Sequence, residues 1–252
     1  PTSATISEGE SITLKATITP ESVLEKGVKW HSSNEEVAIV QNGVVSGKKV
    51  GNATISATTI DGSNLSATCT ITVIPILATS ITMSQSSASL KLGESISLSA
   101  MVSPQNTTNK DVKWNSSNES VATVDNGYVV AKGIGNSTIS ATTTDGTNLS
   151  TTCKITVNPI LATSITMSQS SASIKLGESI SLSATISPQN TTNKEIKWSS
   201  NDNTVASVDN KGNVSSLGIG IATITAETTD GSGIKATCKV TVNPITAFSV
   251  SL

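Results

Sequence analysis

The chain has 252 residues, a formal net charge of −2 at pH 7 and charged side chains at only 13% of its positions. All 16 basic residues are lysines, although arginine is the residue best suited to recognising phosphate groups. Composition and charge therefore argue against nucleic-acid binding. No apolar run approaches the roughly 20 residues of a membrane helix, so we expect no membrane insertion in this segment.

The sequence contains one unit three times. Trp30, Trp114 and Trp198 are spaced 84 residues apart, and the residues around them repeat at the same interval. Residues 76–100 and 160–184 differ at a single position. A fixed long period predicts an array of similar units, and about 84 residues is a normal size for a small domain. We therefore predict three domains and a short terminal segment, at residues 1–75, 76–159, 160–244 and 245–252.

The strands of the second unit can be predicted in chain order. Ser80–Met83 and Ser89–Leu92 are expected to be short strands, and Ser95–Val102 alternates strictly between polar and apolar residues, which predicts one strand. The turn signals Asp125-Asn-Gly127 and Asp145-Gly146 follow, and the second predicts a hairpin between the last two long strands. The other predicted strands are Asp111–Ser116, Val121–Val124, Gly127–Lys132, Ser137–Thr143 and Leu149–Val157.

Short strands at regular spacing, without helical periodicity, predict an all-β fold built from Ig-like β-sandwiches. The junction Val73-Ile-Pro75-Ile-Leu77 is apolar and contains proline, unlike a flexible Gly/Ser linker. We therefore expect three tandem sandwiches in an elongated rod. Ile76 and Leu77 are expected to pack at the domain boundary.

One tryptophan and one cysteine in each unit are predicted to support its core. The tryptophan lies on the third strand, where Ig-like sandwiches bury one. The cysteine alternates in step with apolar residues, as in Ala67-Thr-Cys69-Thr-Ile71, so it belongs to the buried face of its strand. We interpret it as a small core residue rather than as a reactive thiol or metal ligand. The predicted core-structural residues are Trp30, Trp114, Trp198, Cys69, Cys153 and Cys238.

Distinctive motifs recur in the units. In the second unit they are Lys113-Trp-Asn-Ser-Ser-Asn118, Val121-Ala-Thr-Val-Asp125, Gly135-Asn-Ser-Thr-Ile139, Thr144-Asp-Gly146 and Thr152-Cys-Lys-Ile-Thr-Val157. Together these segments resemble the bacterial Ig-like domain, group 2 family, and the resemblance covers essentially the whole chain. It implies spacer or adhesive modules of bacterial surface proteins, with relatives in phage structural proteins and beside extracellular carbohydrases. The family has no catalytic residue set to transfer.

The sequence offers little for catalysis or metal binding. His31 is the only histidine and is expected to point outward, so no Ser/His/Asp or Cys/His constellation is predicted. Asp145, Glu178 and Asn158 could each supply an oxygen atom to calcium, but acidic residues are too sparse for such a site. Asp145 is instead expected to stabilise its own turn. We predict no enzyme activity, no catalytic or metal-binding residue and no cofactor.

The two ends of the chain are complementary in sequence. Pro1 aligns with Gln85, so the first unit lacks the equivalent of the strand at Ser80–Met83, while Asn243–Leu252 aligns with Asn158–Met167. Two interpretations are open. Either a longer array is interrupted at an arbitrary point, or the tail of one molecule completes the open edge of the next and builds a filament. The donated apolar residues would then be Ile245, Phe248, Val250 and Leu252.

The leading hypothesis for function is a non-catalytic stalk or fibre segment of a bacterial cell-surface or extracellular protein. Head-to-tail self-association is added to it only under the second interpretation of the chain ends. The alternative is an adhesin module that recognises an unknown protein or glycan ligand on a host or neighbouring cell. Its contacts would be expected in the loops Pro104–Asn109 and Pro188–Asn193. Near-identical units favour the stalk, because repetition adds length without adding a distinct site.

Overall fold

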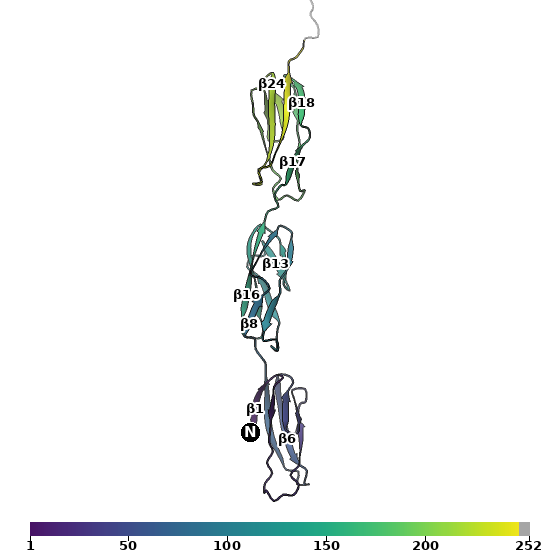
Figure 1. The fold of residues 1–252 in the computed structure, drawn as a ribbon, viewed down its shortest axis with the longest axis vertical. Helices are drawn as coiled ribbons and strands as arrows, with labels where there is room; N and C mark the ends of the chain where they lie inside the picture. The colour runs from purple at the N-terminus through teal and green to yellow at the C-terminus, as the bar shows by residue number, and fades with distance from the viewer. Residues whose placement is uncertain (247–252) are drawn as a thin grey trace, which may run out of the picture.

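The computed structural model describes residues 1–246 and contains only strands, turns and loops over that range. Three units follow one another along the long axis, and each is a β-sandwich of its own (Figure 1). The predicted fold class, three tandem Ig-like sandwiches in an elongated rod, is therefore confirmed.

The second unit shows the complete arrangement. Its four-stranded sheet has the order β12-β15-β16-β9, in which β9 runs parallel to β16 and the other pairs are antiparallel. The opposite layer consists of a three-stranded sheet, β10-β14-β13, and the two-stranded pair β11-β8. The strands are β8 (Ser80–Met83), β9 (Ser87–Lys91), β10 (Ser95–Ser97), β11 (Ala100–Ser103), β12 (Val112–Ser116), β13 (Ala122–Asp125), β14 (Tyr128–Ala131), β15 (Gly135–Thr143) and β16 (Ser150–Asn158).

The third unit repeats this topology, with sheets β18-β25-β24-β21, β19-β23-β22 and β17-β20. Its strands are β17 (Ser164–Met167), β18 (Ser171–Lys175), β19 (Ser179–Ser181), β20 (Ala184–Ser187), β21 (Ile196–Ser200), β22 (Ala206–Val208), β23 (Asn213–Ser216), β24 (Gly220–Thr228) and β25 (Lys235–Asn243).

The first unit has the same four-stranded and three-stranded sheets, β1-β7-β6-β3 and β2-β5-β4. Within the described residues it has no counterpart of the two-stranded pair. Its strands are β1 (Ser3–Ser7), β2 (Ser11–Thr13), β3 (Val28–Ser32), β4 (Ala38–Gln41), β5 (Val44–Gly47), β6 (Gly51–Thr59) and β7 (Ser66–Ile74).

Each core lies between the four-stranded sheet and the opposite layer. In the second unit Ile139, Cys153 and Ile155 from β15 and β16 meet Val129 from β14, and all four are completely buried. These residues come from alternate positions of their strands, as the period of two dictates. The three cysteines Cys69, Cys153 and Cys238 are all free thiols in such clusters.

The predicted strand Ser95–Val102 is broken in the structure. Residues 95–97 form β10 in the three-stranded sheet, whereas residues 100–103 form β11, which pairs with β8. Between them Leu98 is buried and donates its amide to Gly127, and Ser99 bonds to Ser84. The chain thus changes sheets without interrupting its alternation, and for this reason the pattern alone did not reveal the break.

The tryptophans are half-buried rather than fully buried as expected. Each packs against the edge of its core and lies beneath the turn of a hairpin in the opposite layer. In the second unit that turn is Asn126-Gly127, with φ of 47° and 84°. A Cβ atom on Gly127 would lie 3.1 Å from Cζ2 of Trp114 and would collide with the Leu98 carbonyl oxygen.

The residues buried at the junctions are not all the ones that were expected. Leu77 is 47% exposed and Leu161 is 43% exposed, while Ala78 and Ala162 beside them are buried. Ile76 is half-buried and bonded to Thr108 through both its amide and its carbonyl. The alternation of an extended segment therefore turns Ile76 and Ala78 toward the following unit and Leu77 outward.

Candidate functional site

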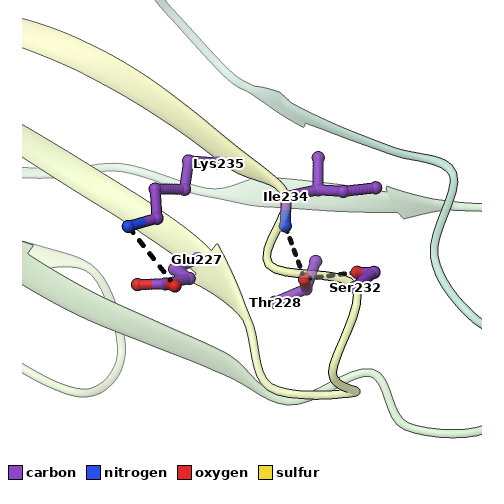
Figure 2. Close-up of polar contacts among 5 residues, drawn as sticks. All are labelled: Glu227, Thr228, Ser232, Ile234 and Lys235. Atoms are coloured by element: carbon purple, nitrogen blue, oxygen red, sulfur yellow. Dashed lines mark hydrogen bonds and ion pairs between the residues drawn. The ribbon is translucent and has the colours of Figure 1, made fainter.

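The most distinctive polar arrangement is the turn between the last two strands of each unit. In the third unit the Thr228 hydroxyl lies 2.7 Å from the Ser232 hydroxyl and accepts the Ile234 amide at 3.2 Å (Figure 2). Oδ1 of Asp230 accepts the amide of Ser232 at 3.0 Å. Figure 2 also shows the cross-strand ion pair between Lys235 and Glu227, at 3.4 Å.

The same turn occurs in all three units. Thr143, Asp145 and Thr147 make equivalent bonds in the second unit, and Thr59, Asp61 and Ser63 make them in the first. The prediction that aspartate serves these turns agrees with this geometry. In all three units one carboxylate oxygen, Oδ1, is thus used within the turn.

The second carboxylate oxygen distinguishes the first unit from the others. Oδ2 of Asp145 accepts the backbone amide of Ala78 at 2.6 Å, and Oδ2 of Asp230 accepts that of Ala162 at 2.5 Å. Both amides belong to the segment that opens the unit. Among the described residues no donor reaches Oδ2 of Asp61, which is exposed.

These bonds lower the pKa values of the three carboxyl groups to different extents. The Thr147 hydroxyl, followed by the Ala78 amide, lowers the pKa of Asp145 to about 2. The Ala162 amide, followed by the Ser232 hydroxyl, lowers the pKa of Asp230 to about 2. The pKa of Asp61 is also below its usual value, chiefly because of the Ser63 hydroxyl. Hydrogen bonds that favour the ionised carboxylate are the cause in each unit.

The opening segments also add a strand to their units. In the second unit β8 pairs with β11 in antiparallel register, from Ser80↔Ser103 to Met83↔Ala100, and in the third β17 pairs with β20 in the same way. The corresponding residues 16–19 of the first unit form no strand. None of the backbone hydrogen bonds found among the described residues involves them. They form an open edge with unpaired backbone groups.

A groove runs along this open edge. Two adjoining hollows, the larger about 470 Å³, are lined by Pro1, Ala16, Ala57, Ala67 and other residues. The smaller reaches Cys69 and Trp30 at the core. In the third unit the corresponding space is filled by a cluster that includes Ala162, Ile165, Ile186 and Ala226.

The open groove exposes apolar residues that the other units cover. Leu65 is 65% exposed, whereas Leu149 and Ile234 at the same place in the repeat are half-buried. Ile18 is half-buried, whereas Val102 and Ile186 are buried. We define these features together, residues 15–19, Leu65, Cys69 and the Asp61 carboxylate, as the unit-one groove.

Of the predicted donor residues, only Ile245 is described, and it is 68% exposed. Phe248, Val250 and Leu252 lie outside the described residues. Their places in the repeat can be read from the third unit, where Ala162 and Ile165 are buried and Met167 is half-buried. Ala247, Val250 and Leu252 correspond to these three residues. Phe248 corresponds to Thr163, which is exposed, so Phe248 is not an inward position in that register.

The other polar residues considered for chemistry serve separate structural contacts. Asn158 donates to the Ser89 hydroxyl at 2.7 Å, Glu178 accepts the Lys175 amide at 2.8 Å, and His31 is exposed. Over residues 1–246 no group of three or more His, Cys, Asp or Glu side chains could hold a metal ion. The same range contains no helix long and apolar enough to span a membrane.

The sequence alone did not indicate the bonds between the turn aspartates and the opening segments. A signal for them was present: an Asp-Gly turn recurs in every unit, and Ala78, Ala162 and Ala247 recur at one place in the repeat. Only the fold shows that these two repeating positions meet.

Fold and contacts define a modular array of β-sandwiches, with a repeated structural role for its polar residues. The model of the bacterial Ig-like domain (group 2) matches three times, at residues 1–71, 77–155 and 161–240. The chain therefore belongs to this family, as its motifs indicated.

Similar proteins include phage and bacterial proteins. The chain is 38% identical over 163 residues to an Ig-like virion protein of Serratia phage KSP90. The aligned segment covers 63% of this chain and 63% of that protein. It is 38% identical over 168 residues to an uncharacterised protein of Clostridium acetobutylicum, covering 66% of this chain and 17% of that protein. The chain thus spans less than two thirds of the length of these relatives.

Solved structures of similar architecture include Drosophila N-cadherin EC1-3, with a TM-score of 0.41 and 14% identity over 97% of this chain and 99% of that one. Domains 1–6 of the surface layer protein SbsC give a TM-score of 0.35 and 18% identity over 96% of this chain and 39% of that one. The chain is a tandem array of Ig-like domains.

Proposed function

We propose that this chain is a non-catalytic stalk or fibre segment of a bacterial cell-surface or extracellular protein. The proposal rests on one observation: in the second and third units the opening segment is held by the same contacts at the same positions of the repeat. An opening segment bonds to the turn aspartate and then pairs with the edge strand, in the second unit and again in the third. Such units extend a chain without adding a distinct site.

The first junction also has a direct contact between neighbouring units. The Thr108 hydroxyl donates to Glu8 at 2.7 Å across it, while the amide of Ile76 donates to Thr108. A junction held in this way resists bending better than a flexible linker does. The similarity to an Ig-like virion protein is compatible with an extracellular structural role.

Small-angle X-ray scattering tests the stalk. At about 3.3 Å per strand residue, three units should give a maximum dimension on the order of 100–130 Å. A two-unit chain of residues 76–246 should shorten it by about a third. A compact particle in which the two chains have similar maximum dimensions would refute the stalk.

Head-to-tail association is the second part of the proposal. The unit-one groove accepts the tail of a second copy as an added strand, a known mode of recognition in which backbone hydrogen bonds supply affinity and alternate side chains enter pockets. The unpaired backbone at residues 16–19, the free Oδ2 of Asp61 and the exposed Leu65 support it. A contact of this kind does not close on itself and therefore produces a filament.

Deletion of residues 247–252 tests this part. The full chain should associate with increasing concentration in sedimentation velocity, and the shortened chain should remain a monomer. Equal association of both chains would rule out donation by the tail.

An adhesive role is the second candidate, because the third unit has an apolar surface that the others lack. Leu217, Ile219 and Ile221 are 59%, 61% and 53% exposed. The second unit has Lys132 and Asn136 in place of the first and third of these residues. The loops at residues 104–109 and 188–193 are less available, since Thr107 and Thr191 are buried and Thr108 bonds to Ile76.

The matched test replaces these residues with those of the second unit, as Leu217→Lys with Ile221→Asn. If the chain is an adhesin, this variant should lose binding to cells or to a glycan array while the wild-type chain binds. Absence of binding by the wild-type chain would leave the stalk as the better account.

A further inference from the structure

Successive units meet at one recurring position. Glu8, which follows β1, accepts the hydroxyl of Thr108 from the loop after the cis peptide Ser103–Pro104. At the second junction the same place in the repeat is held by Leu92. It lines a hollow of about 460 Å³ together with Pro188 and Asn190 of the following unit. We call this position the turn position, and at both junctions it faces the proline loop of the next unit.

Leucine stands at the turn position of the third unit and at the matching proline-loop position of the first unit. Leu176 occupies the turn position of the third unit. Leu24 occupies, in the proline loop of the first unit, the place of Thr108 and Thr192. Leu24 is fully exposed and Leu176 is half-buried. The internal junctions have Glu8 with Thr108 and Leu92 with Thr192, so neither pairs two apolar residues.

Backbone hydrogen bonds place both leucine positions next to residues 243–245 or to the equivalent segment at an internal junction. The Leu176 amide donates to the carbonyl of Asn243 at 2.9 Å, at the point where the chain leaves β25. The residue equivalent to Leu24 in the second unit, Thr108, bonds to Ile76, which is equivalent to Ile245. A tail that enters the groove in the register of the other units therefore brings Leu24 of the acceptor next to Leu176 of the donor.

We infer that Leu24 of one copy docks against Leu176 of a second copy, forming an apolar contact that the internal junctions lack. This inference rests on the proposed head-to-tail association and adds to it a contact outside the unit-one groove. Removal of two leucine side chains from water favours the contact. Leu24 gains most, because it is fully exposed among the described residues. The occupant is a second copy because the third unit presents Leu176 and the tail together.

The pairing predicts the behaviour of charge variants. Leu24→Glu and Leu176→Glu should each weaken association at least tenfold in sedimentation velocity, because each leaves a carboxylate facing a leucine. The double variant Leu24→Lys with Leu176→Glu should associate more tightly than Leu176→Glu alone, since it forms an ion pair at the same place. Such non-additivity is the expected signature of two residues in contact.

Two controls separate the contact from general effects. The first control is Leu92→Glu, which changes the turn position at an internal junction. The second is Leu161→Glu, which changes a leucine away from the contact that is 43% exposed. Both should associate like the wild-type chain. Thermal unfolding followed by circular dichroism should show that all variants are folded.

The outcomes distinguish this inference from the proposal on which it rests. If the wild-type chain remains a monomer, head-to-tail association and the leucine contact both fail, while the length of the stalk is unaffected. If deletion of residues 247–252 abolishes association but Leu24→Glu does not weaken it, only the leucine contact is overturned. Weakening by both single charge variants with rescue by the double variant supports it.

Discussion

The carboxylate of Asp145 accepts a hydrogen bond of 2.6 Å from the backbone amide of Ala78, 67 positions earlier in the chain. This bond fixes the segment that opens the second unit against the turn that nearly closes it. Asp230 and Ala162 repeat the relationship in the third unit. In the first unit Asp61 has the same turn and no such donor among the described residues, and this difference separates an open edge from a closed one.

The bond itself can be tested by comparing two aspartates. Asp145→Ala should accelerate hydrogen exchange at the Ala78 amide and along β8, because both the turn and the attachment of the opening segment are lost. Asp61→Ala removes the same turn bonds but should leave exchange in residues 78–84 unchanged. Equal protection of Ala78 in the wild-type chain and in Asp145→Ala would contradict this role.

The pH dependence of stability follows from the lowered pKa values. In the folded chain the pKa of Asp145 and of Asp230 is about 2, against about 3.9 for an unfolded aspartate. Each group therefore contributes stability that is complete above about pH 4 and is lost as the pH falls toward 2. Urea unfolding at several pH values measures this loss. Between about pH 4 and pH 2 the free energy of unfolding should fall less in the variant Asp145→Asn with Asp230→Asn than in the wild-type chain. If the free energy of unfolding falls equally steeply with pH in the variant and in the wild-type chain, these two aspartates are not the cause of the acid sensitivity.

Gly127 should tolerate substitution poorly because its turn lies over Trp114. Gly127→Ala combines a positive φ with a collision against the Leu98 carbonyl oxygen and should cost about 2–4 kcal/mol in the free energy of unfolding. Gly146→Ala is the matched control, since it has φ of 96° and no atom within 4 Å of the added Cβ. It should cost about 1–2 kcal/mol. Equal losses in denaturant unfolding would show that the contact beneath Gly127 has no effect.

The reactivity of the cysteines tests whether the unit-one groove is open. Cys69 lines the groove, whereas Cys153 and Cys238 are completely buried, and burial raises the pKa of both of these thiols. A small thiol reagent should therefore label Cys69 first, and peptide mapping by mass spectrometry identifies the site. Labelling of Cys69 should slow when the groove is filled. Equal rates at all three cysteines would indicate that the edge is closed.

Much of the fold could be predicted because its strands alternate regularly and its turns contain the residues that positive φ requires. Asp125-Asn-Gly127 predicted a turn, and Asp125 pairs with Tyr128 across it. β8 has the predicted bounds, Ser80–Met83. The change of sheet after Ser97 could not be predicted, because the apolar period continues through Leu98 and only the partners of β10 and β11 differ.

The candidate site was predictable in outline only. Alignment of Pro1 with Gln85 predicted an open edge in the first unit, and the described residues contain no equivalent of β8 there. It could not indicate that Asp61 has an unused oxygen, because Ala78 and Asp145 are distant in sequence and meet only in the folded unit. Likewise, the meeting of Glu8 with Thr108 depends on how two units are joined, and the local sequence does not encode that directly.

The most direct test of the account is the binding of a synthetic peptide with the sequence of residues 243–252 to a chain that lacks residues 247–252. Isothermal titration calorimetry should give one peptide bound per chain, because the second and third units already hold their own opening segments. A chain in which the sequence of residues 160–168 directly precedes Pro1 should bind none, since its groove is closed from within. Failure of the shortened chain to bind the peptide, or equal binding by both chains, would contradict the account.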